Sequence, residues 1–77
     1  MRFIFTAIRE SDGWRLHLLN RNTKYCTWVV CWNYSTQHNS WDWGMYCNDL
    51  KEALSVFTAK CREFNFDKVI EGENFYV

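Results

Sequence analysis

The stretch that decides the fold is Tyr25-Cys26-Thr27-Trp28-Val29-Val30-Cys31-Trp32-Asn33-Tyr34. β-Branched and aromatic side chains suit the pleated surface of a sheet, so this stretch predicts a long central strand. Successive side chains of a strand point to opposite faces. One face would carry Trp28, Val30 and Trp32, and the other would carry Val29 and Cys31. Because both faces are apolar, we expect both to be covered.

Two further strands precede this stretch. Residues 2–9 alternate weakly, with Phe3, Phe5 and Ala7 expected on one face. Ser11-Asp12-Gly13 predicts a hairpin turn, because these residue types tolerate positive φ or bond their own backbone. The second strand, residues 14–19, alternates in two sets: Trp14, Leu16 and Leu18 against Arg15 and His17.

The second half of the chain predicts a loop, a strand and a helix. Residues 20–23 form a turn, residues 35–40 an exposed polar loop, and residues 41–47 a fourth strand interrupted by Gly44. Asp49 and Glu52 have the spacing of a capping box, with Asn48 as the alternative cap. The helix that follows has an apolar stripe of Leu50, Ala53, Leu54, Phe57, Cys61 and Phe64. The tail, residues 67–77, either adds an edge strand or docks as an extended segment.

These elements predict one α+β domain over residues 1–77, an antiparallel β-meander of about four strands with one helix packed on one face. A single helix cannot cover both faces of the sheet. If the helix packs with Leu54 and Phe57 against Trp14, Leu16 and Leu18, apolar groups are left on the other face. These are either Ile4, Ile8, Val29 and Cys31 or the Trp set of the third strand. An exposed apolar face indicates a partner, and a homodimer is one way to cover it.

Charge and hydropathy exclude some classes of partner. Nine basic and nine acidic residues give no net charge, so nothing global favours a nucleic acid or a membrane surface. The apolar run at residues 1–5 is too short for a signal peptide, and no run approaches membrane-spanning length. We therefore expect a cytoplasmic protein whose cysteines stay reduced, although their even number keeps a disulfide framework open.

The sequence supplies no convincing catalytic or metal site. Cys26, Cys31, His38 and Cys47 are ligand types for zinc, but their spacing does not match the close pairs of structural sites. Cys–His catalysis would need an orienting third group, and no spacing sets one. We expect no enzyme activity, no cofactor and no metal.

The aromatic residues carry the strongest functional signal. The chain has five Trp, four Tyr and six Phe among its 77 residues, which raises the question whether one small core can hide them all. We expected Trp41 or Trp43, beside the polar loop, to be at least half exposed. The predicted binding residues are Trp41, Trp43, Trp32, Tyr34, Arg15 and Arg21. The same aromatics with Arg2, Arg15, Arg21 and Lys24 suggest an alternative, binding of single-stranded nucleic acid.

Three segments in this order carry a resemblance: Val29-Val30-Cys31-Trp32-Asn33-Tyr34, Trp41-Asp42-Trp43-Gly44-Met45-Tyr46 and Asp49-Leu50-Lys51-Glu52-Ala53. This order resembles small sheet-plus-helix proteins of bacteriophages and mobile elements. Some proteins of that kind are stoichiometric inhibitors of bacterial defence systems, the anti-CRISPR proteins among them. The resemblance implies a non-enzymatic inhibitor that binds a bacterial protein, and it carries over no site residue, because such inhibitors share no site motif.

Overall fold

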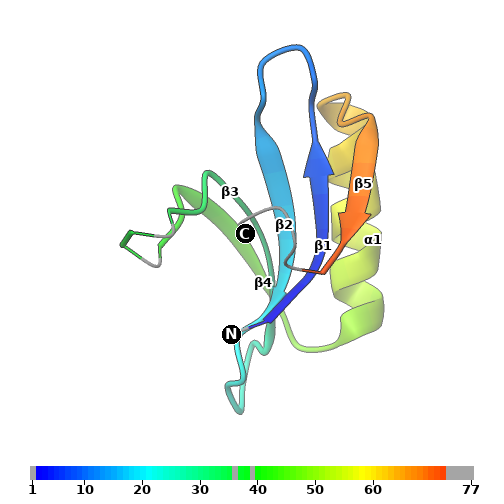
Figure 1. Cartoon of the computed structure of the whole chain (residues 1–77). Helices are drawn as coiled ribbons and strands as arrows, with labels where there is room; N and C mark the ends of the chain where they lie inside the picture. The colour runs from blue at the N-terminus through cyan, green and yellow to red at the C-terminus, as the bar shows by residue number, and fades with distance from the viewer. Residues whose placement is uncertain (1, 36, 39, 73–77) are drawn as a thin grey trace.

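The computed structural model describes residues 2–35, 37–38 and 40–72, which form five strands and one helix. The elements are β1 (Arg2–Ile8), β2 (Arg15–Asn20), β3 (Trp28–Trp32), β4 (Trp43–Cys47), α1 (Leu50–Glu63) and β5 (Lys68–Glu71). The strands form one antiparallel sheet in the order β4-β3-β2-β1-β5, and α1 packs over β2, β3 and β4 on one face (Figure 1). The α+β architecture is therefore confirmed, with β1 to β4 as the meander.

The tail supplies the fifth strand. β5 pairs with β1, and the backbone N–H of Gly72 donates to the carbonyl of Ile4 at 3.0 Å. The edge-strand alternative for residues 67–77 is thus confirmed over residues 68–71. Docking of the terminal Phe75-Tyr76-Val77 lies outside the described residues.

The centre of the sheet is β2, because two strands lie on each side of it. The prediction of a long central strand over residues 25–34 was wrong in both length and position. Cys26 has a φ of 49° and Asn33 a φ of 56°, and this left-handed backbone cannot continue a strand. β3 is therefore confined to the residues between them, Trp28–Trp32.

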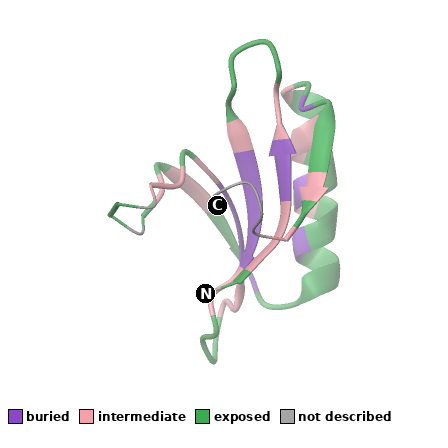
Figure 2. Ribbon diagram, viewed as in Figure 1, coloured by how far each residue is buried: buried purple, intermediate pink, exposed green. Residues whose placement is uncertain are grey.

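Two hydrophobic clusters lie on opposite faces of the sheet. The cluster between the sheet and α1 includes Leu16, Leu18 and Val30, with Trp28 and Trp32 packed against it. The cluster on the other face, here called the open face, consists of Leu19, Val29 and Cys31. The predicted alternation of β3 is confirmed. Consecutive residues of β2 are buried, the purple stretch in Figure 2, so this strand is buried on both faces.

Strand β1 changes face part-way along its length. Phe3 pairs with Leu19 and Phe5 pairs with Leu18, so the register shifts by one residue between them. Such a bulge moves every later side chain to the opposite face. Phe3 consequently packs on the open face, whereas Phe5 and Ala7 pack on the helix side. Their predicted position on a common face was wrong.

Helix α1 begins as its capping residues predict. Asp49 is the N-cap, and its Oδ1 accepts a hydrogen bond from the backbone N–H of Glu52 at 2.7 Å. The helix ends at Glu63, and Asn65 follows with a φ of 59°. None of the helical segments in the described part of the chain is long and apolar enough to span a membrane.

The buried stripe of α1 is rotated from the predicted one. Ala53 and Phe57 are buried, and Val56, Cys61 and Phe64 pack beside them. Leu50 and Leu54 are instead 38% and 36% exposed, so their expected place in the core was wrong. Val56, which the prediction left out, takes their place against the sheet.

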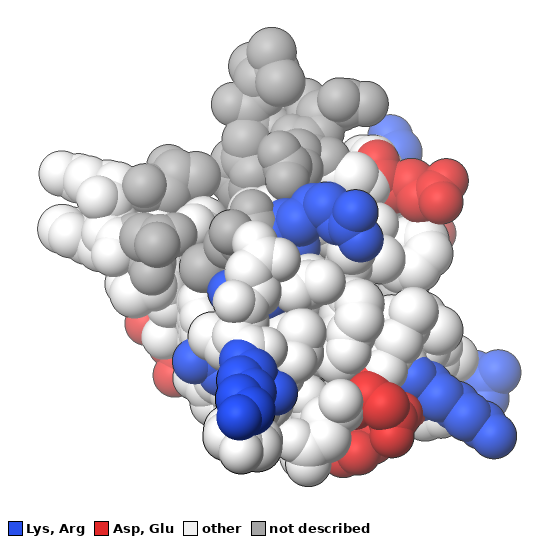
Figure 3. Space-filling view, turned by 90° about the horizontal axis from the view of Figure 1, so that it is seen from below, with Lys and Arg blue, Asp and Glu red and all other residues white. Residues whose placement is uncertain are grey.

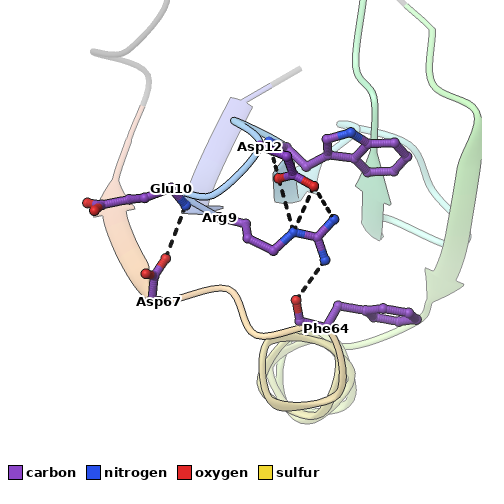
Figure 4. A network of polar contacts seen from close by, with 6 residues as sticks. Arg9, Glu10, Asp12, Phe64 and Asp67 are labelled. Atoms are coloured by element: carbon purple, nitrogen blue, oxygen red, sulfur yellow. Dashed lines mark hydrogen bonds and ion pairs between the residues drawn. The ribbon is translucent and has the colours of Figure 1, made fainter.

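Arg9 joins the β1–β2 hairpin to the end of the helix (Figure 4). Its Nη1 donates to the carbonyl oxygen of Phe64 at 2.8 Å, and its Nε and Nη2 donate to the Asp12 carboxylate at 2.6–3.1 Å. These hydrogen bonds hold the pKa of Asp12 below its ordinary value. Beside them, the backbone N–H of Glu10 donates to Asp67 at 3.3 Å, which ties the hairpin to the start of β5.

The rotated stripe makes a stability prediction. Phe57→Ala should lower the free energy of unfolding by about 3–5 kcal/mol, because it leaves a cavity beside Phe5 in the helix-side cluster. Leu54→Ala is the matched control on the same helix and should lower it by less than about 1 kcal/mol. Urea unfolding of both variants measures the difference. Equal losses would mean that the helix face is misassigned.

Candidate functional site

The open face is covered by aromatic side chains rather than by a helix. Leu19, Val29 and Cys31 are fully buried there, with Phe3, Tyr34 and Trp41 packed against them. The ring of Phe3 meets that of Tyr34 edge to face, with centroids 5.1 Å apart. Edge-to-face pairs stabilise beyond the area that they bury. These three side chains are only partly buried, so they can also contact a partner.

Two of these rings continue into a row with a third ring from β4, and the row of Tyr34, Trp41 and Tyr46 is here called the aromatic shelf. Tyr34 and Trp41 are stacked with centroids 6.2 Å apart and planes inclined by 24°. Trp41 and Tyr46 follow at 6.3 Å, and the indole Nε1 of Trp41 donates to the Tyr46 hydroxyl at 3.2 Å. The shelf therefore runs from the β3–β4 connection onto strand β4.

A cation lies at the β4 end of the aromatic shelf. The guanidinium carbon of Arg21 is 4.9 Å from the centroid of the Tyr46 ring. Its Nη1 also donates to the backbone carbonyl of Cys26 at 3.1 Å. The ring face attracts the cation, and the carbonyl restricts its orientation. Tyr46 is 46% exposed, so this end of the shelf is open to a partner.

Gly44 allows the Trp41 indole to lie across β4. A Cβ placed on Gly44 would be 2.6 Å from Trp41 Nε1 and 3.3 Å from Val29 Cγ2. A side-chain hydrogen bond also closes the β3–β4 connection that precedes Gly44. The side-chain Nδ2 of Asn33 donates to Asp42 at 3.0 Å, and the two residues flank the β3–β4 connection. The indole therefore packs directly on the backbone of Gly44, in space that the side chain of any other residue at this position would fill.

This packing makes Gly44→Ala a test of the aromatic shelf. The added methyl group should displace Trp41 and lower the free energy of unfolding by about 1–3 kcal/mol, as overpacking does. In a Trp41→Ala background the same substitution should cost less, because only the approach to Val29 Cγ2 at 3.3 Å remains. Chemical unfolding of the two single variants and the double variant measures this coupling. Additive losses would contradict the contact.

Strand β4 forms one edge of the sheet and carries no charged residue. Its sequence is Trp43-Gly44-Met45-Tyr46-Cys47, and Met45 is 43% exposed. Natural edge strands usually carry charges that block pairing with another chain. The opposite edge follows that rule, since β5 begins at Lys68 and ends at Glu71. The β4 edge and the aromatic shelf beside it are therefore the candidate binding surface.

The six predicted binding residues do not lie together. Tyr34, Trp41 and Arg21 belong to the candidate surface, as described above. Trp32 and Trp43 lie on the other face, where their rings are 4.8 Å apart and pack against the helix-side cluster. Both residues are partly buried, and the structure does not bring them together with the aromatic shelf. The alternation of β3 already indicated the helix-side position of Trp32.

Arg15 and Tyr46 complete the comparison with the predicted site. Arg15 pairs with Ile8 and lines a hollow of about 200 Å³ with His17, Asn33 and Tyr34, so it lies near the Tyr34 end of the aromatic shelf. Tyr46 was missed, although its alternation with Gly44 along residues 43–47 places both on the face of Val29 and Cys31. That alternation was the available signal.

The expected exposure of tryptophan was wrong. Trp14 is the most exposed of the five at 41%, and Trp41 and Trp43 are both partly buried. Each of those two rings packs against a cluster, one on each face of the sheet. The indoles near the polar loop are thus used to cover the sheet.

A polar row crosses the open face beneath the rings. Thr6 Oγ1 and His17 Nδ1 are hydrogen-bonded at 2.8 Å, and His17 pairs across the strands with Cys31. Burial, assisted by the positive charge of Arg15, lowers the pKa of His17 to about 4. Burial also raises the pKa of Cys31 to about 12. This His–Cys pair is therefore neutral at pH 7, which is the reverse of an activated thiolate.

The buried His17 predicts a loss of stability in acid. The unfolded chain takes up a proton near pH 6.5, whereas the folded chain resists it until about pH 4, so stability falls as the pH drops through this window. The loss should reach about 2 kcal/mol at pH 5, above the range in which most carboxylates titrate. His17→Gln should remove this pH dependence in urea unfolding between pH 7 and pH 5. An unchanged slope would contradict a neutral buried histidine.

The thiols are not arranged for metal binding. Cys31 and Cys47 lie in clusters on opposite faces, and all four cysteines are free thiols. Burial raises the pKa of Cys47 and of Cys61. Among the residues that the structure describes, no three His, Cys, Asp or Glu side chains are grouped to hold a metal ion.

The chain was compared with protein-family models, with curated protein sequences and with solved structures, and none of them matches it.

Proposed function

We propose that the protein is a non-catalytic module that binds another protein by accepting one of its extended segments along β4. The observation that carries this proposal is the uncharged edge of β4, which lies beside the aromatic shelf of Tyr34, Trp41 and Tyr46. Addition of a strand to an open edge provides main-chain hydrogen bonds, and neighbouring side chains provide specificity. Tyr, Trp and Arg are also the residues most enriched among energetically important interface positions.

The resemblance to phage and mobile-element proteins suggests the kind of partner. We infer a bacterial protein, with a component of a defence system as the target and the bacterial cytoplasm as the place of action. An inhibitor of this kind acts by occupying a surface of its target, so it needs no catalytic group. The neutral His17–Cys31 pair on the open face is compatible with that role.

Charge placed on the edge tests this mode of binding. Met45→Lys puts a cation in the centre of β4 and should weaken capture of a bacterial partner from lysate at least tenfold, about 1.4 kcal/mol. Val69→Lys is the matched control on β5, where the side chain is 54% exposed, and it should capture as the wild type does. Quantitative mass spectrometry of the captured proteins measures both. Equal capture by both variants would place binding elsewhere.

A second candidate function is the binding of single-stranded nucleic acid. It is favoured by the stacked rings of Tyr34 and Trp41 with the cation of Arg21 near by, since bases stack on aromatics and cations contact phosphates. The zero net charge disfavours it. Affinity for an oligonucleotide that falls steeply with salt would support this candidate over protein binding.

A further inference from the structure

Arg21 is held in position by its own chain while part of its guanidinium stays available. Its backbone N–H donates to the Thr27 carbonyl at 2.7 Å, and its Nη1 donates to the Cys26 carbonyl at 3.1 Å. The Tyr46 ring lies 4.9 Å beneath the guanidinium carbon. Within the described residues, Nε and Nη2 have no hydrogen-bond partner. Together these two groups form the fork that binds a carboxylate through two parallel hydrogen bonds.

The acidic residues adjoining β4 are already engaged by other groups. Asp42, before β4, accepts from the Asn33 side chain at 3.0 Å, and Asp49, after β4, caps helix α1. Figure 3 views the end of the molecule at which the β2–β3 connection lies, and side chains of both charges are exposed on it. Arg21 and the neighbouring Lys24 therefore present positive charge with no acid of the described chain paired to them.

An added strand that continues the antiparallel pairing of the sheet places its side chains on defined partners. A residue opposite Tyr46 would have its Cβ about 5 Å from that of Tyr46, on the face where Arg21 lies. The next residue, opposite Met45, would turn to the helix side and meet the exposed thioether. The residue after it, opposite Gly44, would return to the open face beside the Trp41 indole.

We propose that the segment bound along β4 carries Asp or Glu opposite Tyr46, with Arg21 as the receptor of its carboxylate, followed by two apolar residues. This inference rests on the proposed function, because it assumes strand addition at β4. It specifies the partner as an extended acidic–apolar–apolar segment. The preorganised fork makes the acidic position selective, since Arg21 loses little side-chain freedom when it binds.

Selection of peptides from a random seven-residue library tests the inference. Peptides enriched on the wild type but not on Met45→Lys should share one acidic position followed by apolar residues. Selection on Arg21→Gln should keep the apolar positions and lose the acidic one, whereas Lys24→Gln, the matched control, should keep both. Thermal melting checks that each variant is folded.

Affinity measurements on one selected peptide make the test quantitative. Replacing its acidic residue by the amide should weaken binding to the wild type about tenfold and to Arg21→Gln less than about twofold. Arg21→Lys should show the same weak preference for the acidic peptide as Arg21→Gln, because an ammonium group cannot form two parallel hydrogen bonds with a carboxylate.

The outcomes separate the inference from the function on which it rests. Enriched peptides without an acidic position, or an amide substitution without effect, would overturn the role of Arg21 and leave strand addition in place. If the wild type enriched no peptides that Met45→Lys does not also enrich, strand addition at β4 would itself be overturned. Displacement of the peptide by oligo-dT would assign the aromatic shelf to nucleic acid. A wild-type mass of twice 9.4 kDa that Met45→Lys halves would assign β4 to a second copy of the chain.

Discussion

Burial of β2 on both faces is the constraint on which the rest of the structure depends. Leu16, His17, Leu18 and Leu19 are consecutive and all buried, so the strand needs cover on both sides of the sheet. The described chain has one helix, and it covers one side. Large aromatic side chains must cover the other, because few residues remain in so short a chain. The need to cover the second face of the sheet thus accounts for the aromatic content as much as any binding role does.

Aromatic cover has a consequence that helical cover would not have. A helix would hide the open face completely, whereas the rings of Tyr34, Trp41 and Tyr46 form a surface that is itself apolar and partly exposed. The row ends at β4, which is an edge strand of the sheet formed by the described residues, and an edge strand presents backbone hydrogen-bonding groups on its outer side. A partner strand at β4 could therefore contact the aromatic side chains and the backbone of the edge strand together. This coincidence distinguishes β4 from the charged β5 edge.

The candidate site was only partly accessible to sequence reasoning, and the reasons are specific. Arg21, Tyr34 and Trp41 were chosen mainly for their residue type, and all three lie on the open face. Trp43 was chosen on the same grounds and lies under the helix. Trp41 precedes β4, so strand alternation does not assign it a face. Its position depends on the bare backbone of Gly44, a contact between side chain and backbone that composition does not reveal.

The sequence by itself determined the features that depend on neighbouring residues. The hairpin turn ending at Gly13, the capping of α1 by Asp49 and the alternation of β3 all follow from local backbone and hydrogen-bonding preferences. Only the tertiary structure decided that β2 is central, that a bulge in β1 separates Phe3 from Phe5, and that Leu54 faces solvent. These outcomes depend on packing between segments distant in the chain. Local preference says what a segment can form, and long-range packing selects the face it buries.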